Sequence, residues 1–132
     1  MTTIIVSEDC GNSPKNIFLQ NLAIAFAKGD LQFILSSVTD DVRWQIVGER
    51  LFQGKTEFAK ALANMENASV EEINIQHVVT HGKAGAVNGI KTQKDGKIIA
   101  FCEVVEFNGA KATHVKEITS YGIEITRTQT IE

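Results

Sequence analysis

Two glutamates inside an apolar stretch are the first residues whose chemistry stands out. Residues 98–107 read IIAFCEVVEF and are followed by Asn108 and Gly109. A run this apolar before turn residues predicts a strand that is buried on at least one face. Because successive side chains of a strand point to opposite faces, Glu103 and Glu106 must point in opposite directions. One carboxyl group is therefore expected inside the protein, where desolvation raises its pKa.

Two histidines are the other candidates for acid–base chemistry. His77 and His81 lie four residues apart on one predicted strand, where we expect them to share a face with Ile73, Ile75 and Val79. This spacing separates the two side chains by about 13 Å, which is too far for both to bind one metal ion. Histidines in such positions more often fill a core or a dimer face. His77, deeper in the strand, is the better candidate for a general base.

The sequence contains no motif for a cofactor. No Ser-His-Asp set, phosphate-binding loop, dinucleotide fingerprint or metal-ligand spacing is present, so we expect neither a metal nor an organic cofactor. Cys10 and Cys102 form no C-x-x-C pair. Two unpaired thiols are the simpler interpretation, and a disulfide between them stays open. His114 begins the last predicted strand and its direction is open.

Helices in the first half and strands in the second must position these residues. Ser13 is a good N-cap, Pro14 suits a first turn and Gly29 suits a helix end, so a long helix is expected between them. Asp30 can cap a short second helix. The further elements expected are helices over 31–38 and 55–65, a loop over 48–54, and strands over 41–47, 70–82, 84–93, 98–107 and 112–128.

This order predicts an α+β fold. Asp95-Gly96 and Asn108-Gly109 between apolar runs are strong hairpin signals, so the last strands form an antiparallel meander. We expect a cone-shaped α+β barrel with three N-terminal helices packed on a strongly curved, mostly antiparallel sheet. Residues 1–132 form one domain, and residues 1–12 are expected to be flexible or loosely attached. The conical space between sheet and helices is the place expected for chemistry.

Composition excludes several classes of partner. The chain has 132 residues, a net charge of −3 and a pI of about 5.6, with lysines and arginines scattered singly. No basic footprint for nucleic acid or an anionic membrane is present. The arginines do not cluster, so they give no indication of an anionic substrate. No stretch approaches a membrane span of about 20 apolar residues, and the start lacks the pattern of a signal peptide. We expect a cytoplasmic protein.

Five stretches carry a family resemblance: Gly29-Asp30, DVRWQIVG (41–48), GKTEF (54–58), FCEVVEFNGAK (101–111) and HVKEITSY (114–121). Together they resemble the nuclear-transport-factor-2-like (NTF2-like) superfamily, in particular its SnoaL-like and ketosteroid-isomerase-like branch. The resemblance covers most of the chain in element order. It implies a cone of three helices and a curved sheet, a homodimer, and an apolar pocket for a small hydrophobic molecule.

The resemblance to ketosteroid isomerase also implies site residues, and two of that enzyme's three groups are missing. Glu103 falls at the position of the oxyanion-hole acid. The position of the proton-shuttling aspartate falls on Gln45, an amide that cannot act as a base, and the phenol position falls near Leu22. Trp44 and Tyr121 fall at pocket-lining strand positions, although core packing would also account for them. The candidate ligand-binding residues are Trp44, Gln45, Phe101, Val105, Tyr121, Leu22 and Phe26, and the candidate catalytic residues are Glu103 and His77.

Three hypotheses for function follow. The first is a cofactor-free isomerase, cyclase or hydrolase in which Glu103 donates a proton or orients the substrate, with His77 as base. The second is a small-molecule binder without turnover, which fits Gln45 and Leu22 better. The third is a dimerising structural module whose cone is filled by aromatic side chains.

Overall fold

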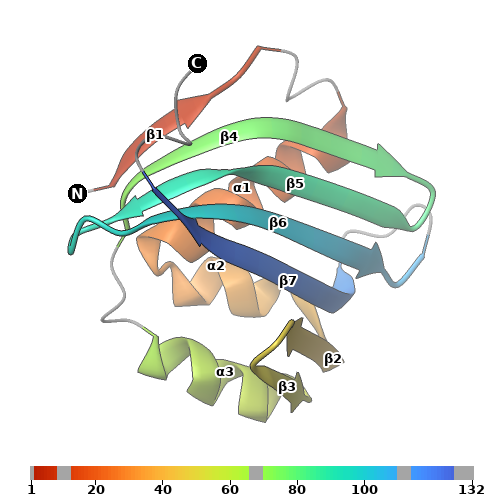
Figure 1. The fold of residues 1–132 in the computed structure, drawn as a ribbon. Helices are drawn as coiled ribbons and strands as arrows, with labels where there is room; N and C mark the ends of the chain where they lie inside the picture. The colour runs from red at the N-terminus through yellow and green to blue at the C-terminus, as the bar shows by residue number, and fades with distance from the viewer. Residues whose placement is uncertain (1, 9–12, 66–69, 110–113, 127–132) are drawn as a thin grey trace.

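A computed structural model describes residues 2–8, 13–65, 70–109 and 114–126 of the chain (Figure 1). One sheet of seven strands has the order β1-β4-β5-β6-β7-β2-β3. Neighbouring strands are antiparallel, except that β1 runs parallel to β4 and β2 parallel to β7. Figure 1 shows strands β4 to β7 bending over α1 and α2. The elements are β1 (Thr3–Val6), α1 (Pro14–Lys28), α2 (Leu31–Ser36), β2 (Val38–Ile46), β3 (Arg50–Gln53), α3 (Lys55–Asn64), β4 (Val70–His81), β5 (Ala84–Gln93), β6 (Ile98–Phe107) and β7 (Val115–Ile125).

The ends of the first two helices are formed as their local sequence predicts. The Ser13 hydroxyl accepts a hydrogen bond from the Asn16 N–H at 3.1 Å, which caps α1. Gly29 ends α1 in the left-handed conformation, at φ 73°, which glycine adopts without steric cost. Asp30 caps α2 by accepting from the Phe33 N–H at 3.2 Å. The three helices and mostly antiparallel sheet confirm the predicted α+β class.

Two short strands were not expected from the sequence. Thr3–Val6 forms β1 at the edge of the sheet, where Ile4 and Val6 pack against the core, so this part of the N-terminus is not loosely attached. Arg50–Gln53, expected as a loop, forms β3 and pairs with β2. Gly48, at φ 84°, allows the chain to reverse between β2 and β3. Four-residue strands contain too few positions for an alternating pattern to be recognised.

An aromatic cluster joins α1 and α3 to the β2–β3 hairpin. The ring of Trp44 lies 5.7 Å from that of Phe26 on α1, 5.6 Å from Phe52 on β3 and 5.3 Å from Phe58 on α3, measured between ring centroids. Offset and edge-on aromatic contacts at these separations stabilise a core beyond the area they bury. These contacts fix the position of the C-terminal end of α1 relative to β2 and β3. No helix in the described part of the chain has the length and apolar character that crossing a membrane requires.

Candidate functional site

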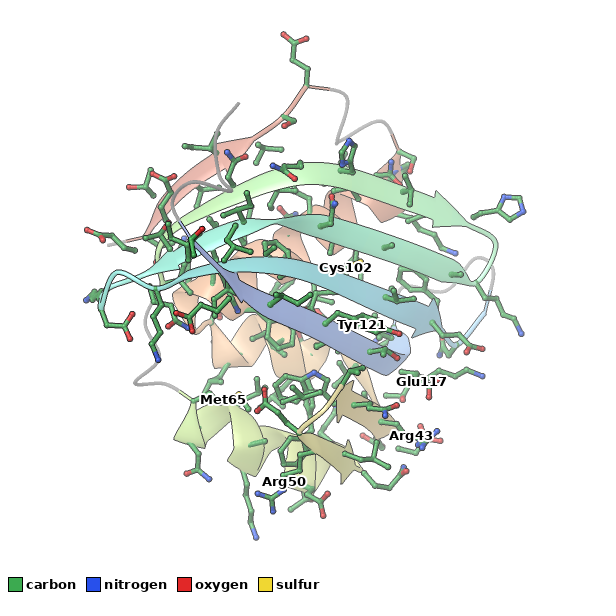
Figure 2. All side chains as sticks on the ribbon, viewed as in Figure 1. Arg43, Arg50, Met65, Cys102, Glu117 and Tyr121 are labelled. Carbon is green, nitrogen blue, oxygen red and sulfur yellow. The ribbon has the colours of Figure 1, made fainter. Side chains whose placement is uncertain are left out.

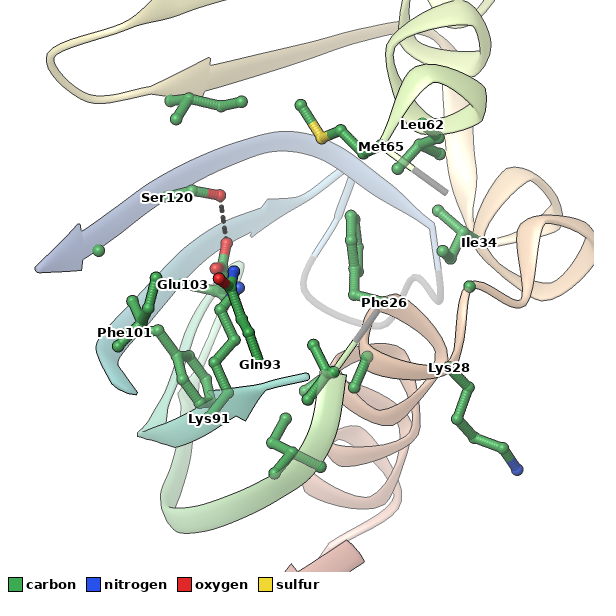
Figure 3. A pocket seen from close by; sticks show the side chains of 18 of the residues that line it. Phe26, Lys28, Ile34, Leu62, Met65, Lys91, Gln93, Phe101, Glu103 and Ser120 are labelled. Atoms are coloured by element: carbon green, nitrogen blue, oxygen red, sulfur yellow. Dashed lines mark hydrogen bonds between the residues drawn. The ribbon is translucent and has the colours of Figure 1, made fainter. Parts of the chain in front are cut away.

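A cavity of about 680 Å³ lies between the inner face of the sheet and the helices (Figure 3). This volume is within the range of sites for small molecules. Its helical wall is mainly apolar and includes Phe26, Ile34, Leu62 and Met65, with Lys28 at the end of α1. Its sheet wall carries polar groups, which come from β5, β6 and β7. The sheet-wall residues that matter below are Lys91, Phe101, Glu103 and Ser120.

Strand alternation on β6 places Glu103 in the cavity wall and Glu106 on the outer face. Phe101 lines the cavity beside Glu103, whereas Val105 and Phe107 continue the same face into the closed core. Glu106 forms an ion pair with Lys116 on β7, with 3.2 Å between Oε2 and Nζ. The opposite directions of the two carboxyl groups are as predicted.

A chain of hydrogen bonds orients the Glu103 carboxyl group. Ser120 stands directly opposite Glu103 in the β6–β7 register. The Trp44 indole Nε1–H donates to Ser120 Oγ at 2.8 Å, and the Ser120 hydroxyl donates to Glu103 Oε1 (Figure 3). Because an indole N–H can only donate, the serine uses its single proton for the carboxylate. The three residues therefore hold the carboxylate in one orientation at the cavity surface.

The Glu103 carboxyl group changes its charge near neutral pH. Burial raises the pKa of Glu103 from 4.5 to about 7, while the Ser120 hydrogen bond and the positive charge of Lys91 lower it. Burial has the larger effect because it removes the solvation that favours the charged form. A carboxyl group with a pKa near the working pH can both accept and donate a proton. Within the described cavity wall, Glu103 combines this pKa with a fixed orientation.

Lys91 is a charged residue of the cavity that sequence reasoning missed. It lies on β5, opposite Ile99 of β6, and its side chain shares the sheet wall with Glu103 (Figure 3). Its charge acts on the Glu103 carboxyl group, but among the described residues its ammonium group forms no ion pair. The hairpin turn at Asp95-Gly96 gives a usable signal, since it fixes the β5–β6 register and so the face of Lys91.

Three predicted ligand-binding residues lie outside the cavity. Gln45 is exposed on the face of β2 opposite Trp44, because neighbouring residues of a strand cannot both point inward. Leu22 and Val105 are each 2% exposed and belong to the closed core. The isomerase-like positions of Gln45 and Leu22 are therefore not part of the cavity wall.

His77 is also placed elsewhere, and its predicted face was wrong. A register irregularity in β4 between Ile75 and His77 shifts the alternation, so Ile75 faces the core while His77 and Val79 are exposed. The His77 Nδ1 lies 3.0 Å from Asn88 Oδ1 on β5, at the protein surface. His81 and His114 are exposed as well. No histidine of the described residues lines the cavity.

The remaining predicted residues border the cavity. Trp44, Phe101 and Phe26 line it. Tyr121 lies at its edge with 47% of its surface exposed, and it pairs across the sheet with Cys102 (Figure 2). Cys102 forms no disulfide with a described residue, and Cys10 lies outside the described residues.

Comparisons with known proteins give the fold. No protein-family model matches the chain, and no curated protein matches its sequence. An NTF-2 like protein of unknown function from Burkholderia xenovorans LB400 is similar in structure, with a TM-score of 0.71 and 15% identity, covering 89% of this chain and 93% of that chain.

Two further solved structures have names that include an activity. An LEH-like epoxide hydrolase from M. tuberculosis has a TM-score of 0.67 and 17% identity, covering 81% of this chain and 80% of its own. A candidate SnoaL-like polyketide cyclase from Shewanella denitrificans OS-217 has a TM-score of 0.69 and 12% identity, covering 84% and 92%. At these identities the likeness shows the fold alone, and an activity has to be inferred from the residues of the site.

Proposed function

From the NTF2-like fold of this chain, which ketosteroid-isomerase-like and SnoaL-like proteins share, we propose that its cavity binds a small, mainly apolar molecule and that Glu103 transfers a proton to or from it. The observation that carries the proposal is the Glu103 carboxyl group in the cavity wall, oriented by Ser120 and Trp44. Burial raises its pKa to about 7, so both protonation states are populated at neutral pH.

The two protonation states suit different steps of one reaction class. The carboxylate form can remove a proton from carbon next to a carbonyl group, and the acid form can protonate an oxygen of the substrate. Isomerisation, cyclisation and epoxide opening all require such proton movements. The apolar side chains of the helical wall favour a substrate with an apolar body. His77 has no place in this proposal, because it lies on the outer face of the sheet.

Glu103→Gln is the direct test, with Glu106→Gln as its matched control on the same strand. Panels of enolisable aryl ketones and of epoxides would be followed by proton NMR in D₂O, which detects both hydrogen exchange and ring opening. We expect the wild type and Glu106→Gln to convert one class, and Glu103→Gln to lose at least about 100-fold, the usual contribution of a positioned acid or base. Equal rates for Glu103→Gln and wild type would remove Glu103 from the mechanism.

Binding without turnover is the second candidate function. The observation that favours it is the placement of Gln45 and Leu22 outside the cavity, which leaves Glu103 without the isomerase's companion groups. Thermal-shift screening with steroids, polyketides and fatty acids separates the two candidates. A compound that stabilises the wild type and is recovered unchanged supports the binder, whereas conversion that Glu103→Gln abolishes supports the enzyme. A structural module with a filled cone gains no support from a cavity of about 680 Å³.

A further inference from the structure

The cavity has one feature that an entirely apolar ligand would leave unused. Lys91 lies on a strand in the middle of the sheet, on the face turned to the helices, where lysine is rare. Its ammonium group acts on the Glu103 carboxyl group through space, yet the two are too far apart for an ion pair. Both groups line the same cavity, together with Gln93 of β5, so a polar group of a ligand in the cavity can approach both.

The chemistry of the neighbouring groups indicates the charge and the hydrogen-bonding character of that polar group. A lysine ammonium group can only donate hydrogen bonds, and a protonated Glu103 donates one as well. The position between them therefore calls for an acceptor, and a carboxylate supplies two oxygens and a negative charge. Hydrogen bonds between charged groups are stronger than neutral ones. A ketone would supply one neutral acceptor and would leave the lysine charge uncompensated.

The charges around the rest of the cavity agree with an anionic group. Lys28 at the end of α1 and Lys94 after β5 also border the cavity, and Glu49 in the turn between β2 and β3 is the other carboxylate among its described lining residues. Tyr121 of β7 is at the edge. With Glu103 protonated, the lysines outnumber the carboxylates, which attracts anions toward the opening. The described cavity-lining residues of α2 and α3 are all uncharged.

We propose that the ligand of this cavity is an apolar carboxylic acid, with its carboxylate between Lys91 and Glu103 and its apolar body against Phe26, Leu62 and Met65. The inference rests on the proposed function for the location of the site and adds the class of ligand. Lys91 then acts as the anchor of the carboxylate, and Glu103 in its acid form as the second donor.

Ligand binding and proton uptake are linked in this arrangement. A carboxylate next to Glu103 disfavours a second negative charge there, so binding keeps Glu103 protonated. By linkage, affinity for the carboxylate must fall as pH rises through about 7, by up to tenfold per pH unit. A neutral ligand has no such repulsion, so its affinity should change much less over the same range. Glu103→Gln, whose amide can donate at every pH, should bind the carboxylate with little dependence on pH.

Isothermal titration calorimetry with two matched probes tests the inference. The probes are phenylbutyrate and the methyl ketone in which an acetyl group replaces its carboxylate. For wild type at about pH 7 we expect phenylbutyrate to bind at least tenfold more tightly, with proton uptake seen as a buffer-dependent heat. Lys91→Met should weaken phenylbutyrate by about 10- to 100-fold, the contribution of a hydrogen bond to a charged group. The ketone should bind Lys91→Met as it binds the wild type, which also shows that the variant is folded.

Two control variants separate a specific anchor from a general effect of charge. Lys91→Arg keeps the positive charge and should keep most of the affinity for phenylbutyrate. Lys60→Met removes an exposed lysine of α3 that does not line the cavity and should change the affinity less than about threefold, because exposed charges are screened. Equal affinity for both probes, or an unchanged affinity of Lys91→Met for phenylbutyrate, overturns the carboxylate inference and leaves the proposed cavity in place. Failure of both probes to bind the wild type overturns the inference and the proposed function together.

Discussion

The Glu103→Gln substitution should make the protein more stable at neutral and alkaline pH. Glutamine has nearly the shape of glutamic acid, and its amide oxygen can still accept the Ser120 hydrogen bond. What it removes is the ionisation of a buried carboxyl group. At high pH this group is charged in the wild type, whereas the glutamine of the variant is uncharged at every pH.

The size of the effect follows from the pKa of Glu103. A pKa that rises by one unit corresponds to about 1.4 kcal/mol. The rise from 4.5 to about 7 therefore corresponds to about 3 kcal/mol. Because the folded pKa lies above the unfolded one, the folded state binds more protons between these values, and its stability falls as pH rises from 4.5 to about 7. The stability gain of Glu103→Gln over wild type should grow by this amount across that window and stay constant above it.

Urea unfolding of the wild type, Glu103→Gln and Glu106→Gln at a series of pH values measures this difference. Glu106 is paired with Lys116 at the surface, so Glu106→Gln should follow the wild-type profile closely. The three proteins share all other titrating groups, so the comparison isolates the one carboxyl group. Parallel profiles of the wild type and Glu103→Gln would refute the burial of this carboxyl group as the cause of its raised pKa.

Three further perturbations address the register, the hydrogen-bond chain and assembly. Ser120→Ala removes the hydrogen bond that lowers the pKa of Glu103, so its titration, followed by carboxyl ¹³C NMR, should move to higher pH. Gly89→Ala would place a Cβ atom 2.0 Å from the Asn74 carbonyl oxygen, so urea unfolding should show a loss of about 3 kcal/mol or more. The predicted homodimer would cover apolar side chains on the outer face of the sheet, so Ile123→Lys, at a site that is 68% exposed, should give monomers in light scattering.

Each of these perturbations has a control in the same chain. Gly122→Ala places its Cβ atom 3.4 Å from the nearest described atom, so it should cost less than about 1 kcal/mol; an equal loss at both glycines would contradict the steric argument. Ile17→Lys, on α1 and 46% exposed, should leave a dimer intact. A wild type that is monomeric at all concentrations would refute the homodimer. A Glu103 titration that Ser120→Ala leaves in place would contradict the assigned hydrogen bond.

Local signals predicted the helices, because the groups that end a helix lie next to it in sequence. Ser13, Gly29 and Asp30 each act within a few residues of their own position. The opposite directions of Glu103 and Glu106 were predictable for the same reason, since β6 is regular between them. The short strands β1 and β3 could not be found, because only pairing with distant strands defines them.

The contents of the site depended on register, which the sequence specifies only in part. In β4, the register irregularity after Ile75 turns His77 to the surface. No residue type in that stretch indicates such an irregularity. Ser120 could not be placed opposite Glu103, because the β6–β7 register also contains an irregularity, between Glu106 and Phe107. Lys91 was within reach of prediction through its hairpin turn. Apolar residues are typical of pocket walls, and a lysine among them is not.

The hydrogen bond between Trp44 and Ser120 makes the fluorescence of Trp44 a signal of events in the cavity. Trp44 is the only tryptophan of the chain, so all indole emission comes from one ring at the cavity wall. Its N–H is bonded to the hydroxyl group that contacts Glu103, so a change of charge on Glu103 alters the electric field at the indole. Proton binding and ligand entry can therefore be followed in the unlabelled protein, in real time, by the wavelength and intensity of a single fluorophore.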